Sequence, residues 1–237
     1  LAKFNRVVVP DHMGFGKSDT PKDKPYTLAQ HIDNFTKLLL ELNLKDITLV
    51  FQDWGGPISF GFATIHPDKV ERLVIMNTGV GVLPAGAKTW ISDMEGRGIL
   101  EDVLGNMARF IPRMFASTLV HGTATETMIR AYKAPFPDRS SCIGAIAFPR
   151  DIPVGDHHPS ATTMRSIQKK LGLLKDKAKI IIWGMKDPIF PKLVLDWWRK
   201  VYPDAESHEL AEAGHFLQED APEKIVAIVT NFLRKNP

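Results

Sequence analysis

The segment that most constrains this chain runs from residue 47 to residue 57, where an apolar stretch meets two glycines. Ile47–Phe51 is rich in β-branched and aromatic residues, and it predicts a strand buried on both faces. The Gly-Gly-Pro sequence that follows opens a helix, so Asp53 lies on a tight turn between the strand and the helix. Such a turn projects one side chain out of the sheet into a cleft, which is the geometry of a nucleophile elbow.

An aspartate at this turn implies particular chemistry. A serine, the usual residue of such an elbow, must first give a proton to a base, whereas an ionised carboxylate is already a nucleophile. Asp53 would displace a leaving group from carbon and form an aspartyl ester. The alternative is a structural aspartate that caps the helix it precedes. The nucleophile is favoured over the helix cap because Asp187 and His215, described below, can complete a catalytic triad with Asp53.

Strands and helices alternate on both sides of the turn. Each predicted strand is short and apolar, and the predicted helices carry apolar residues at three- and four-residue spacing. Strands are predicted at 6–10, 47–51, 70–76, 179–183 and 207–210, and helices at 27–42, 162–174, 193–202 and 222–234. This alternation predicts an α/β fold on a mostly parallel, doubly wound sheet.

The alternation stops between residues 79 and 159, where helix-prone pieces are separated by glycine and proline. We expect this region to form a helical cap inserted into a core made of residues 1–78 and 160–237. The predicted helical pieces are 90–96, 99–110, 112–119 and 125–132. Two segments rich in aromatic residues and proline, 132–138 and 148–153, are predicted to be loops at the rim of an apolar pocket.

Three chemically active side chains follow three different predicted strands. Asp53 follows 47–51, Asp187 follows 179–183 and His215 follows 207–210. Because ligands of parallel sheets bind outside the carboxyl ends of the strands, these side chains can converge on one cleft. The order nucleophile, acid, histidine is that of a hydrolase triad. We expect His215 to be the general base on water and Asp187 to hold its tautomer and stabilise its imidazolium.

Composition and charge narrow the possible partners. The net charge is only +3, and the basic residues are scattered, so nucleic acid is not an expected partner. No apolar run approaches the roughly 18 residues of a spanning helix, so we expect no membrane partner. The single cysteine, Cys142, favours a cytoplasmic location, although the N-terminal end that would carry an export signal is missing. The histidine pair 157–158 lacks other ligands nearby, so no metal site is predicted.

Several motifs together resemble those of haloalkane dehalogenases of the α/β-hydrolase superfamily. The resemblance covers nearly the whole chain. Its most specific part is the Gln-Asp-Trp-Gly form of the elbow, because the sibling epoxide hydrolases typically carry histidine before the aspartate. The motifs lie at 10–19, 50–56, 134–138, 148–150 and 214–219.

The resemblance implies a reaction and a set of binding residues. A small haloalkane would be hydrolysed through an aspartyl ester to an alcohol and a halide ion, with water as co-substrate and without metal or organic cofactor. The indole N–H of Trp54 would bind the leaving halide, and its backbone N–H would help to hold the oxyanion. Positions that line the substrate pocket of the family correspond to Phe148, Pro149 and Ile189.

The chain also departs from the pattern of this family. It begins at what resembles the fourth strand, so strands one to three, the second halide-binding group and half of the oxyanion hole are missing. The third strand of that fold lies between the fourth and the fifth, and its loss would leave both neighbours with an unpaired edge. A non-catalytic hydrolase-fold protein or an inactive fragment is therefore an alternative. An epoxide hydrolase is another, but it usually needs two cap tyrosines, and the cap has only Tyr132.

Overall fold

The computed structural model describes residues 1–120 and 124–237, and its centre is a parallel sheet. In the described part of the chain the sheet has four strands in the order β1-β2-β3-β4, and each neighbouring pair is parallel. The strands are β1 (Ile47–Gln52), β2 (Val70–Met76), β3 (Ala178–Gly184) and β4 (Glu206–Leu210). The predicted α/β fold with a parallel sheet is confirmed.

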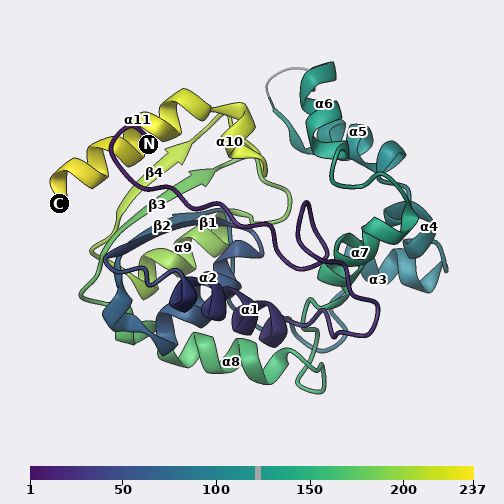
Figure 1. Ribbon diagram of the computed structural model, residues 1–237, viewed down its shortest axis with the longest axis horizontal. Coiled ribbons are helices and arrows are strands. Elements are labelled where there is room, and N and C mark those ends of the chain that lie inside the picture. The colour runs from purple at the N-terminus through teal and green to yellow at the C-terminus, as the bar shows by residue number, and fades with distance from the viewer. Residues whose placement is uncertain (121–123) are drawn as a thin grey trace.

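Helices cover both faces of the sheet (Figure 1). One face packs against α1 (Leu28–Glu41), α2 (Gly55–Ile65), α8 (Ala161–Lys170) and α9 (Lys192–Val201). The other packs against α10 (Leu217–Asp220) and α11 (Pro222–Lys235). Short 3₁₀ helices span Pro67–Lys69, Arg139–Cys142 and Leu171–Leu174. Apolar residues on both faces explain why the inner strands lack polar alternation.

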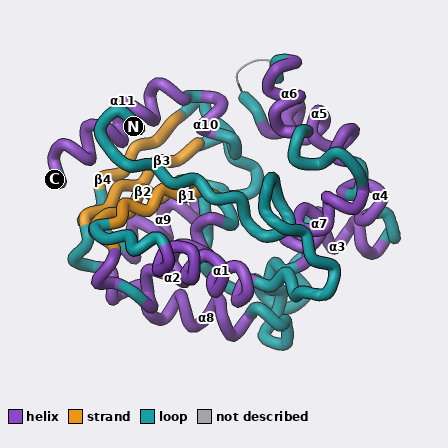
Figure 2. Tube along the Cα trace, in the orientation of Figure 1, coloured by secondary structure: helices purple, strands orange, loops and turns teal. Residues whose placement is uncertain are grey.

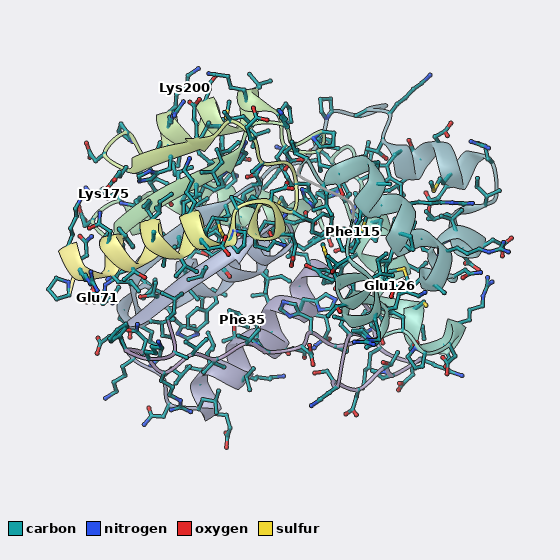
Figure 3. All side chains as sticks on the ribbon, turned by 90° about the horizontal axis from the view of Figure 1, so that it is seen from above. Phe35, Glu71, Phe115, Glu126, Lys175 and Lys200 are labelled. Atoms are coloured by element: carbon teal, nitrogen blue, oxygen red, sulfur yellow. The ribbon has the colours of Figure 1, made fainter. Side chains whose placement is uncertain are left out.

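The remaining helices gather beside the sheet, on the right in Figures 1 and 2, and Figure 3 shows Phe115 and Glu126 on that side. They have an apolar cluster of their own around Ile91, Leu100 and Leu104. These helices are α3 (Trp90–Gly96), α4 (Leu100–Leu104), α5 (Met107–Thr118), α6 (Glu126–Lys133) and α7 (Ile143–Arg150). The division into a core of 1–78 and 160–237 and a cap of 79–159 stays a prediction.

The predicted strand at residues 6–10 is wrong. This segment is not assigned to any strand, and Val9 is 85% exposed. A β-branched sequence needs the N–H and C=O groups of a neighbour to become a strand, and β1 is the edge of the described sheet. The segment therefore runs along the surface without ladder hydrogen bonds.

The predicted loop at 148–153 is also wrong in its first half, because Phe148 and Pro149 belong to helix α7. Likewise, Pro112 lies inside α5 instead of separating two helices. Proline in a helix interior removes one backbone hydrogen bond, which is why the sequence pattern predicted breaks there. In α5 the side chains of Ile111 and Phe115 on either side of Pro112 are buried, and their packing outweighs that loss.

Candidate active site

The turn after β1 holds Asp53 in the conformation expected of an elbow. Its φ is +50°, in the left-handed region that few residues other than glycine adopt. The backbone N–H of Asp53 donates to the carbonyl of Asn77 at 3.0 Å, and the Thr78 hydroxyl donates to the Asp53 carbonyl at 2.6 Å. A Cβ on Gly56 would lie 2.0 Å from the Thr78 Oγ1 atom, so α2 needs glycine there to pack against this segment. The elbow is thus tied to the end of β2.

The structure brings together the three residues that were predicted to converge. The His215 Nδ1 atom lies 3.0 Å from Oδ2 of Asp187, and its Nε2 atom lies 3.6 Å from Oδ2 of Asp53. The residues follow β1, β3 and β4, whose carboxyl ends meet at one edge of the sheet. One imidazole therefore connects two carboxylates, one on each ring nitrogen.

Asp187 is held as an anion in a buried position. Burial alone would raise the pKa of its carboxyl, but the hydrogen bond and charge of His215 and the N–H groups of Ile189 and Phe190 outweigh it, so the pKa is lowered. The Asn77 amide also donates to Oδ2 of Asp187 at 2.8 Å. Because the same amide is fixed by Gly184 through its oxygen at 2.7 Å, the acid is locked to the ends of β2 and β3.

His215 carries a raised pKa although its side chain is only 5% exposed. Burial lowers its pKa, but the hydrogen bond that the ring donates to Asp187, its interaction with the Asp53 carboxylate and the charges of both carboxylates outweigh burial and raise the pKa to about 9. In the free protein at neutral pH the imidazole is therefore mostly protonated. Removal of the charge on Asp53 would remove part of this stabilisation.

Asp53 itself is accessible, with 40% of its side chain exposed. It precedes the N-terminus of α2, where the positive end of the helix dipole favours an anion. The carboxylate is thus within reach of both a small molecule and His215.

The other predicted site residues lie at different distances from this centre. The centroid of the Trp54 ring is 5.2 Å from that of Phe148, so α7 lies against the elbow. Pro149 follows in the same helix and is partly buried. Ile189 is 44% exposed, and its backbone N–H donates to Oδ1 of Asp187 at 2.7 Å.

Three neighbours of the triad were not predicted to act in the site. Gln52 contacts His215, Asn77 holds Asp187, and the ring of Phe190 is nearly parallel to that of His215 at 5.9 Å. Gln52 was recognised only as part of a motif, and Asn77 only as a residue that could not be the acid. The sequence signal that could have identified them is their position at the ends of strands. Gln52 ends β1 and Asn77 directly follows β2, so both lie at the edge of the sheet that carries Asp53 and Asp187.

Within residues 1–120 and 124–237, no group of three or more His, Cys, Asp or Glu side chains could hold a metal ion. Among the helices of the same residues, none combines the length and apolar character needed to cross a membrane.

Comparison with known proteins assigns the chain to a protein family. The family model described as the alpha/beta hydrolase fold matches residues 2–222. The chain belongs to this family. Among the known relatives of this α/β-hydrolase is haloalkane dehalogenase 1 of Mycobacterium tuberculosis, which is 36% identical over 93% of the chain and 72% of the relative. The crystal structure of an ancestral haloalkane dehalogenase matches 95% of the chain and 80% of that structure, with a TM-score of 0.83 and 25% identity.

These similarities confirm the resemblance of this α/β-hydrolase to the haloalkane dehalogenases. Another relative is named for a different reaction. A cis-3-alkyl-4-alkyloxetan-2-one decarboxylase of Shewanella oneidensis is 34% identical over 98% of the chain and 75% of the relative. A decarboxylase among the relatives was not predicted from the motifs.

Proposed function

We propose that this α/β-hydrolase is a haloalkane dehalogenase that converts small haloalkanes to alcohols and halide ions through an aspartyl ester. The observation that carries the proposal is the arrangement of Asp53, His215 and Asp187. A carboxylate on a strained elbow lies 3.6 Å from an imidazole whose other nitrogen lies 3.0 Å from a buried carboxylate. The relatives named as haloalkane dehalogenases support the same reaction.

In the first step, an oxygen of Asp53 attacks the carbon that bears the halogen. A carbon–oxygen bond forms as the carbon–halogen bond breaks, and the halide leaves with the bonding electrons. The indole N–H of Trp54 is the proposed donor to the leaving halide, because an uncharged donor suits a large, weakly hydrated anion. Phe148, Pro149 and Ile189 are the proposed lining of the substrate pocket, and the contact of Phe148 with Trp54 supports the first of them.

In the second step, water hydrolyses the ester. Esterification removes the charge of Asp53, so one of the two carboxylates that raise the pKa of His215 is lost. His215 then gives up its proton more readily and becomes a neutral base, which takes a proton from the attacking water. Asp187 stabilises the imidazolium that results. The products are the alcohol, the free carboxylate of Asp53 and a proton.

Decarboxylation of an oxetan-2-one is a second candidate function, and the relative of that name favours it. Asp53 would attack C4 of the ring and displace the ring carboxylate, just as it would displace a halide. Loss of carbon dioxide would then form the C3–C4 double bond and expel Asp53. The atoms balance without water, so this reaction needs no general base.

Hydrolysis of an epoxide is less well supported. Its ring oxygen needs an acid, and Tyr132 is the only cap tyrosine. The Tyr132 hydroxyl donates to Oε1 of Glu219 at 2.7 Å. Burial, followed by the hydrogen bond and charge of Glu219, raises the pKa of this phenol well above its ordinary value, so Tyr132 is a weak acid here.

The reaction is tested by product analysis with three substrate classes. The purified protein is incubated with short bromoalkanes, a cis-3,4-dialkyl-oxetan-2-one and styrene oxide, beside the Asp53→Asn variant. We expect bromide and alcohol from the bromoalkanes and no bromide from the variant. Alkene and carbon dioxide from the oxetanone, without bromide from any bromoalkane, would establish the decarboxylase instead. Diol from styrene oxide without bromide would favour the epoxide hydrolase.

We also propose a cytoplasmic location for the protein. The single cysteine, Cys142, is buried and unpaired, which is typical of proteins from reducing compartments. Fractionation of the native cells with antibody detection tests this location.

A further inference from the structure

Gln52, the last residue of β1, contacts both the backbone and the ring of His215. Its amide nitrogen lies 3.2 Å from the His215 carbonyl oxygen, to which it donates a hydrogen bond. The same nitrogen lies 3.2 Å from Nε2 and 3.4 Å from Nδ1 of the imidazole. No other side chain of the site described above contacts the main chain and the ring of His215 together.

These distances place the amide over the face of the ring. The two ring nitrogens flank a single carbon, so an atom almost equally close to both would collide with that carbon if it lay in the ring plane. The bonding directions of the two ring nitrogens, whether an N–H or a lone pair, point outward in that plane, toward Asp53 and Asp187. The amide therefore leaves both in-plane positions free for proton transfer, and it restricts the ring from one face.

Other groups restrict the ring as well. The Phe190 ring is inclined by only 23° to the imidazole at 5.9 Å, and the Phe216 ring meets it nearly edge-on at 5.1 Å. The charged groups that contact the imidazole are Asp187, from the loop after β3, and Asp53, from the elbow. Gln52 is thus an uncharged polar contact on a ring otherwise surrounded by carboxylates and aromatic rings.

We propose that Gln52 is a positioning residue for the hydrolytic step, holding the His215 ring so that its Nε2 atom faces the ester formed on Asp53. This inference rests on the proposed dehalogenase function. The attack of Asp53 on the substrate does not use His215, so Gln52 acts on the second step and not on the first. The amide N–H also has its positive end against the ring face, which disfavours the imidazolium and favours the neutral base.

The kinetic test separates the two steps. Gln52→Met keeps the length of the side chain and removes the donor, and Gln168→Met makes the same change in α8, away from the site. Rapid quenching after mixing with a bromoalkane measures the burst of bromide, and intact mass spectrometry measures the alkylated protein. In Gln52→Met we expect an unchanged burst rate, accumulation of the ester and hydrolysis slowed by about tenfold or more, since small displacements of catalytic groups have such effects. Gln168→Met should match the wild type.

A hydrolysis rate within about twofold of the wild type would overturn the proposal, as would a burst rate that falls in the same proportion as hydrolysis, the sign of a merely structural role. Gln52→Glu is the second variant, in case Gln52→Met unfolds. It keeps the shape of the side chain but replaces the donor with an anion, and we expect the same loss of the second step.

A measurement without substrate distinguishes failure of this inference from failure of the proposed function. The imidazole signals of His215, assigned with His215→Phe, are followed by NMR against pH in the wild type and in Gln52→Met. We expect the pKa of His215 to be higher in the variant, because the donor over the ring face is gone. An unchanged or lower pKa would overturn the role of Gln52 even if the wild type releases bromide. If the pKa of His215 is higher in Gln52→Met but the wild type releases no bromide, the role of Gln52 at the ring is retained and the dehalogenase function is refuted.

Discussion

Asp53 and His215 are coupled at the scale of single residues. The backbone of Asp53 is in the left-handed region, which costs about 1–3 kcal/mol and persists only where the surroundings enforce it. Here they include the Asn77 carbonyl and the Thr78 hydroxyl. The strain aims the carboxylate at His215, whose pKa depends on that charge. The protonation of His215, the proposed base, is therefore linked to the charge of Asp53, the proposed nucleophile.

Asp53→Asn tests this coupling, because a neutral amide imitates the neutral ester. We expect the pKa of His215 to fall below the value of about 9 in the wild type, since one carboxylate is removed while Asp187 remains. The raised pKa of His215 also makes the stability of the fold depend on pH. A histidine whose folded pKa exceeds its ordinary value of 6.5 stabilises the fold fully below pH 6.5 and loses that contribution as the pH rises through about 9. The loss should be smaller in the variant.

Histidine NMR and urea unfolding between pH 6 and pH 10 measure these two effects. Asp33→Asn is the control, because Asp33 is an exposed aspartate in α1 that pairs with Lys37 at 2.7 Å. A His215 pKa that is the same in the wild type and in Asp53→Asn would contradict the coupling.

At the scale of elements, the contact between α2 and the residues after β2 sets the elbow. Gly56 lies so close to Thr78 that a Cβ would overlap the hydroxyl, and that hydroxyl holds the Asp53 carbonyl. Thr78 therefore takes part both in the packing of α2 and in the positioning of Asp53. A side chain at position 56 must either push α2 away or displace Thr78.

We expect Gly56→Ala to lower the free energy of unfolding by about 1–3 kcal/mol, the usual effect of overpacking. Bromide release should fall with it, because the elbow moves. Urea unfolding measures the first effect. Gly96→Ala is the matched control, since a Cβ on Gly96 meets nothing within 4 Å near the end of α3, and it should change stability by less than about 0.5 kcal/mol. Equal stability of Gly56→Ala and the wild type would show that α2 adapts freely.

Much of the core could be predicted because local patterns and global packing agree there. Apolar runs predicted the strands of the sheet to within a few residues. Thr27, which was predicted to begin a helix, is the N-cap of α1 and accepts a hydrogen bond from the Gln30 N–H at 3.3 Å. The convergence of Asp53, Asp187 and His215 followed from the rule that parallel strands share a carboxyl edge. The strand at 6–10 could not be judged from its own residues, because pairing depends on a neighbour.

Side-chain contacts across the site were harder to predict. Asn77 and Gln52 are ordinary polar residues, and only their places beside Asp187 and His215 give them a role. Helix α7 was missed because Pro149 and the aromatic Phe148 are typical of loops, whereas packing of Phe148 against Trp54 and Phe15 favours the helix. These contacts join segments that are far apart in the sequence.

At the scale of the whole molecule, the proposed cap joins the proposed core through two segments that lie side by side. The backbone of Leu83 forms hydrogen bonds with Pro153 and with Gly155, each at 2.9 Å, so the entering and leaving chains run side by side. The carboxylate of Asp151 accepts from the backbone N–H of Leu28 at 2.6 Å and from the Ser160 hydroxyl at 2.7 Å. The end of the proposed cap is thus fixed to the start of α1.

The proposed division into core and cap predicts that the core folds alone. In a variant with residues 85–150 replaced by a short Gly-Ser linker, we expect a cooperative urea transition at a lower midpoint, because the contacts of Phe148 with the core are lost. We also expect no bromide release, because the proposed substrate pocket is gone. Loss of the cooperative transition would show that the two parts form a single folding unit.

The central claim is that Asp53 becomes alkylated, and peptide mapping of a stalled intermediate tests it most directly. His215→Phe keeps a ring but removes the base, so the ester should form and persist. After incubation with 1-bromobutane we expect one butyl group per protein by intact mass and its location on Asp53 by tandem mass spectrometry, with one bromide released per protein. An unmodified protein, or a butyl group on another residue, would contradict the account.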